Sequence, residues 1–215
     1  MIWTNTSDEL LEILTPYSDW FFKQDLEWLN KLSKENPKNT DTMDNALSSH
    51  YLQAILDLDG RHEGYPEISM SYDFNQGGLP GEFQEKYQDL SKELCTWLGA
   101  RNEAVHVYYP INGFMSWHNN WNAPGYNILL SYTKNGGGFF KYRDPKTHEV
   151  IEMLDTPGWS CKVGYYGRGR EPDKVYYHTA GTHEPRLTLG FVIPNLDMWR
   201  DMIEDISGKD ASHLS

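Results

Sequence analysis

The pattern of hydrophobic positions changes near residue 100, from a helical period to the short runs typical of β-strands. Apolar side chains recur every three or four positions before residue 33, which predicts two short helices separated at Pro16. The same spacing predicts one further helix over residues 43–58. The clearest helical stripe runs from Phe83 to Trp97, and we expect it to pack on a sheet.

The second half of the chain reads as a series of short strands broken by Gly, Pro and Asn. The predicted strands cover residues 104–109, 126–133, 138–142, 150–154, 160–166, 175–177 and 187–193. Because no helical pattern separates them, we expect an antiparallel sandwich or jelly roll with the early helices covering one face. The expected organisation is a single domain over residues 1–215, in which a helical N-terminal layer (1–100) precedes a β core (101–200) and a polar tail (205–215).

Composition narrows the classes of function. The mean hydropathy is -0.68, and the chain contains neither an apolar run that could cross a membrane nor a secretory signal at its start, so we expect a cytoplasmic protein. A formal charge of -12 disfavours nucleic acid as a partner. With only two cysteines, a disulfide framework or a cysteine-rich zinc site is excluded.

Two of the eight histidines stand in a context that indicates chemistry. His118 and Asn120 follow a Gly turn and are two positions apart, so in an extended segment they lie on one side and can point at the same ion. His178 ends one predicted strand and Arg186 opens the next. These two side chains can therefore face a common cavity.

Residues 104–195 carry a longer series in a recognisable order. The series is Tyr109-Pro110, Asn112-Gly113, His118-x-Asn120, a strand that ends in Tyr132, Gly137-Gly138-Phe139-Phe140, Pro157-Gly158, His178 and Arg186. It resembles the Fe(II)- and 2-oxoglutarate-dependent oxygenases, particularly their prolyl-hydroxylase-like branch. The resemblance implies a mainly β fold with N-terminal helices, built on a cupin-like jelly roll, the double-stranded β-helix. It also implies a hydroxylase that uses 2-oxoglutarate and O₂, forms succinate and CO₂, and acts on an unidentified small-molecule or protein side-chain substrate.

The resemblance also implies roles for individual residues. His118, His178 and Asn120 would hold Fe(II), with His118, His178 and Arg186 as the catalytic set. Arg186 would bind the distal carboxylate of 2-oxoglutarate, since a guanidinium fork matches a carboxylate with two charge-assisted hydrogen bonds. Tyr132 and Tyr109 would complete the cosubstrate pocket, or else be ordinary aromatic residues of a strand.

Asn120 departs from the family, which has Asp or Glu at this position. An asparagine is neutral and ligates only through its amide oxygen, so the site loses one negative charge. Four interpretations stay open. Asn120 is a weaker ligand, or another carboxylate such as Asp144 takes its place. Alternatively, the position is open for a halide, as in 2-oxoglutarate halogenases, although the bulk of asparagine counts against this, or the fold is a non-catalytic binding module.

Three further features have plain structural explanations beside functional ones. Gly136-Gly137-Gly138 is typical of a β-turn, because no helix with Lys-Ser or Lys-Thr follows it. Arg168 and Arg170 lie in a basic loop, either solvated or available as alternative cations for an acidic ligand. The tryptophans near the proposed metal either hold a substrate or pack in the core; they are Trp117, Trp121 and Trp159.

Overall fold

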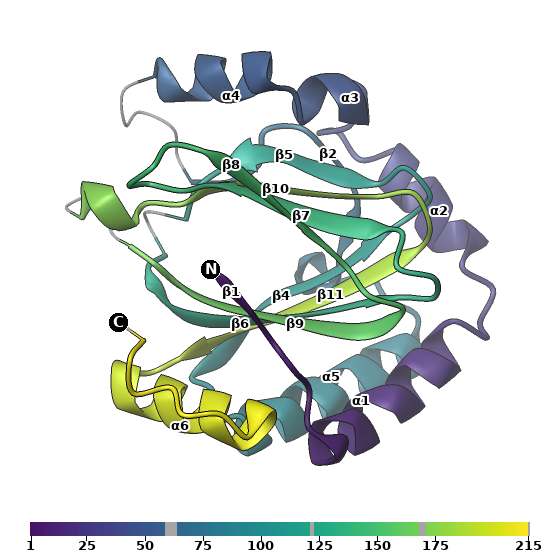
Figure 1. The fold of residues 1–215 in the computed structure, drawn as a ribbon. Coiled ribbons are helices and arrows are strands. Elements are labelled where there is room, and N and C mark those ends of the chain that lie inside the picture. Colours follow the sequence, from purple (N-terminus) through teal and green to yellow (C-terminus); the bar gives the residue numbers. More distant parts are fainter. Residues whose placement is uncertain (59–63, 121–122, 168–170, 215) are drawn as a thin grey trace.

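The computed structural model describes residues 1–58, 64–120, 123–167 and 171–214, and it is mainly β, with two antiparallel sheets and helices around them (Figure 1). The strands are β1 (Ile2–Thr4), β2 (Ser69–Met70), β3 (Tyr72–Asp73), β4 (Asn102–Tyr109), β5 (Phe114–His118), β6 (Gly125–Thr133), β7 (Gly138–Arg143), β8 (Val150–Leu154), β9 (Gly158–Tyr166), β10 (Tyr177–Thr182) and β11 (Arg186–Ile193). The helices are α1 (Asp8–Phe21), α2 (Glu27–Lys34), α3 (Met43–Ala46), α4 (Ser49–Leu56), α5 (Gly81–Trp97) and α6 (Leu196–Ser207), with 3-10 turns η1 (Phe74–Gln76) and η2 (Pro172–Lys174).

The two sheets interleave strands that are distant in sequence. The six-stranded sheet has the order β1-β9-β6-β11-β4-β3, and the five-stranded sheet has the order β2-β5-β10-β7-β8. Figure 1 shows the sheets facing each other, with α1, α5 and α6 on the outer side of the six-stranded sheet and α3 and α4 beyond the other. This pairing brings residues of the second half of the chain together in the space between the sheets.

The prediction that Pro16 separates two helices is wrong, because α1 continues through Pro16 to Phe21. Leu14, Tyr17 and Phe21 are all buried on one face of α1, whereas Pro16 is exposed. Burial of that face offsets the backbone hydrogen bond that a proline cannot donate.

The single helix predicted over residues 43–58 is also wrong, since the segment forms α3 and α4 with a break at Ser48. The Ser48 hydroxyl accepts a hydrogen bond from the Tyr51 backbone N–H at 3.1 Å and so caps a new helix. The predicted helix at residues 83–97 is confirmed as α5.

The chain also forms elements that the hydrophobic pattern did not predict. Residues 1–100 are not purely helical, because β1, β2 and β3 join the sheets. The strand expected at residues 175–177 begins at Tyr177 and runs to Thr182, and β5 and α6 are additional.

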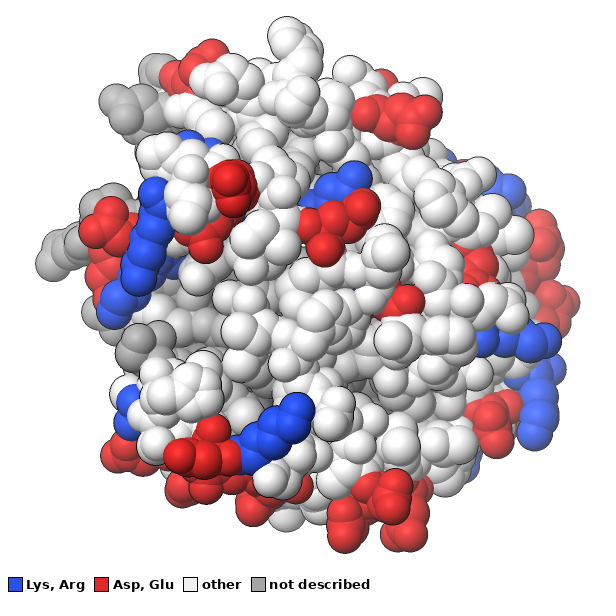
Figure 2. Space-filling model, viewed as in Figure 1, with Lys and Arg blue, Asp and Glu red and all other residues white. Residues whose placement is uncertain are grey.

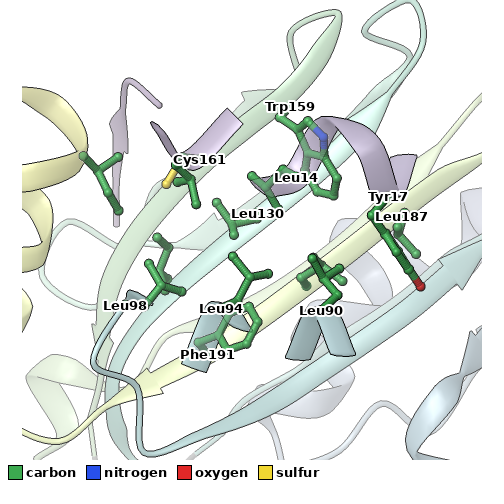
Figure 3. Packing of buried hydrophobic residues seen from close by; sticks show 14 of the residues in the cluster. Leu14, Tyr17, Leu90, Leu94, Leu98, Leu130, Trp159, Cys161, Leu187 and Phe191 are labelled. Carbon is green, nitrogen blue, oxygen red and sulfur yellow. The ribbon is translucent and has the colours of Figure 1, made fainter. Parts of the chain in front are cut away.

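The main hydrophobic core lies between the six-stranded sheet and its helices. Strand alternation sends Leu187, Leu189 and Phe191 of β11 into this core, so Arg186 and Thr188 take the opposite face. Figure 3 shows Leu90 and Leu94 of α5 among these buried residues. The inner face of the sheet carries polar groups such as Arg186 and Thr188 beside a smaller apolar cluster that includes Val107 and Tyr109.

None of the described helices is long and apolar enough to span a membrane. On the face in Figure 2, Lys and Arg side chains are interspersed with Asp and Glu and do not gather into one basic patch.

Candidate functional site

A cavity of about 380 Å³ lies between the two sheets and is lined by residues of both. Its outer part includes the exposed residues Lys38 and Tyr65, and its inner part includes the buried Arg186. Arg186 and Val192 both line it from β11, so it extends along seven residues of that strand, about 20 Å. The cavity is therefore deep enough for a small molecule to reach from the surface to the buried arginine.

His118 and His178 meet on the inner face of the five-stranded sheet. They are directly paired across β5 and β10, their ring centroids are 4.2 Å apart, and both line the cavity. The Nδ1 atom of His118 lies 2.7 Å from the Ser116 carbonyl oxygen, and that of His178 lies 3.1 Å from the Tyr176 carbonyl oxygen. Because a carbonyl only accepts, each Nδ1 donates, and in a neutral ring Nε2 then carries the lone pair that a metal requires.

An irregularity in β5 places His118 on the cavity side. Met115 pairs with Ala180 and His118 pairs with His178, so β5 has one residue more than β10 between these two pairs. Without this β-bulge, residues three apart would point to opposite faces, yet both Met115 and His118 line the cavity. The bulge aims His118 at His178.

Asn120 lines the same cavity as the two histidines. Among the residues that the structure describes, no group of three or more His, Cys, Asp or Glu side chains is placed to hold a metal ion. Asp144 lies elsewhere, in the β7–β8 turn, where its carboxylate accepts hydrogen bonds from the backbone N–H groups of Lys146 and Thr147. Asn120 is thus the residue that accompanies the histidine pair.

Arg186 is buried at the inner part of the cavity, with a side chain that is 2% exposed. Its Nε donates to Asp155 Oδ2 at 2.7 Å, Nη1 to Thr188 Oγ1 at 2.7 Å, and Nη2 to Ser131 Oγ at 2.9 Å. The guanidinium carbon lies 5.3 Å from the centroid of the Tyr109 ring. These contacts fix the plane and position of the guanidinium group.

A second cation shares the carboxylate that binds Arg186. Lys162 Nζ donates to Asp155 Oδ1 at 2.5 Å, and its side chain is 1% exposed. Lys162 and Arg186 line the cavity, whereas Asp155 does not. The two cations hold the pKa of Asp155 below its usual range despite its burial, so this carboxylate is ionised.

Gly138 makes room for this ionic cluster. A Cβ atom at Gly138 would lie 2.8 Å from Arg186 Nε and still closer to the Asp155 carboxylate. The Gly138 carbonyl also accepts the Asp155 backbone N–H at 2.8 Å. The glycine run at residues 136–138 therefore does more than form a turn.

Of the two tyrosines predicted for the cosubstrate pocket, one lies in the cavity. Tyr109 lines it, and burial raises the pKa of its phenol to about 12, so the hydroxyl is protonated. Tyr132 does not line it: its ring packs against Phe22 and Trp159 on the helical side of the sheet. We therefore leave Tyr132 out of the candidate site.

The remaining aromatic and basic candidates lie away from the histidine pair or outside the described residues. The Trp117 Nε1 donates to the Leu47 carbonyl oxygen at 3.0 Å, and the Trp159 Nε1 donates to Ser18 Oγ at 3.2 Å, so both rings pack against helices. Trp121, Arg168 and Arg170 lie outside the residues that the structure describes.

Sequence reasoning missed several residues of the cavity. Tyr166 of β9 has its ring centroid 5.0 Å from that of His178 and so connects the two sheets. Lys162, Ser131 and Thr188 line the polar inner part of the cavity, and Asp155 pairs with the cations without lining it. One feature of the sequence indicates Lys162. It is the only charged residue of the strand Gly158–Tyr166, and strand alternation places its side chain on the face opposite to the core residues of that strand.

Comparisons with known proteins add little to this geometry. No protein-family model matches the sequence, and no curated protein matches it. A Pseudomonas putida prolyl-4-hydroxylase is similar in structure at a TM-score of 0.33 and 14% identity, covering 74% of this chain and 90% of that one. A viral collagen prolyl hydroxylase from Paramecium bursaria Chlorella virus-1 gives 0.30 and 12%, covering 71% and 94%.

A protein of another class scores almost as high. Drosophila melanogaster CENP-C bound to CAL1 gives a TM-score of 0.28 at 10% identity, covering 50% of this chain and 98% of that one. At such scores these similarities assign neither a family nor a function to the chain.

Proposed function

We propose that the chain is an Fe(II)- and 2-oxoglutarate-dependent oxygenase of the hydroxylase type, built on a double-stranded β-helix. The observation that carries this proposal is that the paired His118 and His178 and the buried Arg186 open into one cavity. The alternating strand orders of the two sheets are those expected of a jelly roll, which supports the proposed fold. A small-molecule or protein side-chain substrate would approach through the outer part of the cavity.

The residues present fit the implied metal. His118 and His178 would ligate Fe(II) through Nε2, since both Nδ1 atoms donate to backbone carbonyls, and Asn120 would contribute its amide oxygen. Bound Fe(II) supplies the oxidative decarboxylation of 2-oxoglutarate by O₂, which yields succinate, CO₂ and an oxidant for the substrate.

The chain itself would bind and orient the cosubstrate. Arg186 would hold the distal carboxylate of 2-oxoglutarate, in a position fixed by Asp155, Thr188 and Ser131. Tyr109 would border this site as a neutral phenol. Phe140, whose ring centroid lies 5.5 Å from that of His178, would help to exclude water from the histidine pair.

Metal affinity of single variants tests the proposal. We expect His118→Ala and His178→Ala each to abolish Mn(II) binding, measured by calorimetry with Mn(II) as a redox-inert substitute for Fe(II), because two imidazoles are most of what this site offers. His148→Ala is the matched control, since His148 is exposed in the β7–β8 turn.

The unaltered protein gives a second readout. Anaerobic addition of Fe(II) and then 2-oxoglutarate should produce a weak visible charge-transfer band, as expected when the oxo acid chelates iron at an open site. Mn(II) affinity that is unchanged in both histidine variants, together with no such band, would contradict the proposal and leave a metal-independent binding module.

A further inference from the structure

The inner part of the cavity carries an unbalanced positive charge. Lys162 and Arg186 are both ion-paired to one carboxylate, Asp155, through its two different oxygens. All three side chains are at least 98% buried. With each group ionised, the cluster has a net charge of +1 where water cannot screen it.

The positively charged members of this cluster are the ones that line the cavity. Asp155 does not line the cavity, whereas Lys162 and Arg186 both do, so the cationic residues of the cluster border the cavity and the carboxylate does not. The ammonium of Lys162 has three N–H donors, of which Asp155 takes one at 2.5 Å. It also lies 4.2 Å from the centroid of the ring of Trp3, the residue paired with it across β1 and β9.

We propose that Lys162 is a second cation for the distal carboxylate of the cosubstrate, so that Lys162 and Arg186 form a two-cation site and Asp155 positions both. This inference rests on the proposed function, because it takes a dicarboxylic oxo acid as the ligand. A ligand carboxylate would bring the cluster to zero net charge, two cations against two anions. The inner part of the cavity would therefore select a ligand with a distal carboxylate over one that ends in a neutral group.

The titration of Lys162 supports this reading. Burial lowers the pKa of Lys162 to about 8, and neighbouring Arg186 lowers it while Asp155 raises it. The other groups that face it do not titrate in this range: Arg186 stays protonated, Asp155 stays ionised, and burial raises the pKa of Cys161 to about 12. An arriving carboxylate raises the Lys162 pKa again, so binding near pH 8.5 should take up a proton.

Calorimetry on the metal-free full chain tests the inference with glutarate, a dicarboxylate that lacks the oxo group, and with 2-oxoglutarate. We expect Lys162→Met to weaken binding of both ligands about 10- to 100-fold, the effect of a lost charge-assisted hydrogen bond. Lys162→Arg should recover part of the affinity because it keeps the charge. The control is Lys141→Met, since Lys141 is paired with Glu152 and does not line the cavity.

Proton uptake on ligand binding distinguishes a lysine that contacts the ligand from one with a merely structural role, which would take up no proton. Binding of glutarate to the parent protein at pH 8.5, measured in two buffers of different ionisation enthalpy, should show uptake, and Lys162→Met should show none. This measurement needs only the parent protein, so it remains decisive if Lys162→Met does not fold.

The outcomes separate the two proposals. Normal ligand binding by Lys162→Met, or no proton uptake by the parent, overturns the role of Lys162 and leaves the oxygenase proposal standing. A parent protein that binds neither dicarboxylate overturns the cosubstrate assignment itself.

Discussion

Asn120 is the single residue that most affects what this site can do with a metal. It lines the cavity with His118 and His178, and the described His, Cys, Asp and Glu residues form no group of three that could hold a metal ion. An amide oxygen is a weaker ligand than a carboxylate and leaves the metal site with one negative charge fewer. In the proposed iron site, the identity of this residue would therefore decide both the metal affinity and whether a position is left open for an external anion.

Two substitutions at Asn120 distinguish a ligand from an open position. If the amide oxygen ligates, Asn120→Asp should tighten Mn(II) binding by about tenfold or more, because it adds a charge beside a divalent ion, and Asn120→Ala should weaken it. The measurement is calorimetry with Mn(II), together with succinate formation by the iron-loaded protein.

Halide binding tests the alternative that the position of Asn120 is open to an external anion. If Asn120→Ala binds metal and turns over 2-oxoglutarate as well as the parent does, the ligand role is ruled out. In that case chloride or azide should perturb the iron spectrum of the parent protein, as expected for a position that accepts an exogenous anion.

At the scale of elements, the hydrophobic period predicted the positions of helices and strands better than it predicted which face of an element each side chain occupies. The stripe of α5 and the strands of the second half were predictable, because each buries a regular apolar face. Of the two possibilities for Tyr132, a cosubstrate-pocket residue or an ordinary aromatic residue of a strand, the structure shows the second, because its ring packs against Phe22 and Trp159. Tyr132 lies on the same face of β6 as the core residues Ile128 and Leu130, whereas Asn127 and Ser131 on the alternate face line the cavity, so the alternation of this strand already indicates the core side for Tyr132.

Local irregularities of the strands were the other source of error in predicting the site, because they are determined by contacts between residues that are distant in sequence. The extra residue of β5 is defined only by its pairing with β10, so the spacing around His118 does not reveal it. The ionic cluster joins three residues from three separate segments, which no spacing in the sequence reports. The strand positions of His178 and Arg186 predicted that both can face a common cavity, and the family resemblance implied their roles there.

The start of β7 illustrates how one element depends on another. Gly138→Ala should lower the free energy of unfolding by about 1–3 kcal/mol, because its Cβ would displace the Asp155–Arg186 pair. It should also weaken glutarate binding, since Arg186 would lose its fixed position. Urea unfolding and calorimetry measure the two effects.

The matched control for Gly138 is Gly81→Ala at the first turn of α5, where an added Cβ meets nothing within 4 Å. There the exchange should leave stability unchanged or raise it slightly, because alanine favours a helix. Equal stability of the two alanine variants would show that the close approach at Gly138 does not constrain the ionic cluster.

For the molecule as a whole, the apolar core and the buried charges lie on opposite faces of the six-stranded sheet. The helical side of the six-stranded sheet holds the main apolar core, and the inner side holds buried charge. Burying Lys162 as an ammonium opposes folding, because desolvation disfavours the charged form. The stability of the whole protein should therefore report on this one group as pH changes.

We expect the difference in unfolding free energy between the parent and Lys162→Met to grow in favour of the parent by about 1 kcal/mol from pH 8 to pH 9.5. The folded pKa of Lys162 is about 8 and its ordinary value is 10.5, so the unfolded chain binds more protons in this window and stability rises with pH. Cys95 and Cys161, whose pKa values burial raises, act in the opposite direction, but they do so in both proteins and cancel in the difference. Urea unfolding of both proteins at the two pH values measures it, and a difference that stays constant would mean that Lys162 is protonated in the folded protein as it is in the unfolded chain, so that burial does not lower its pKa.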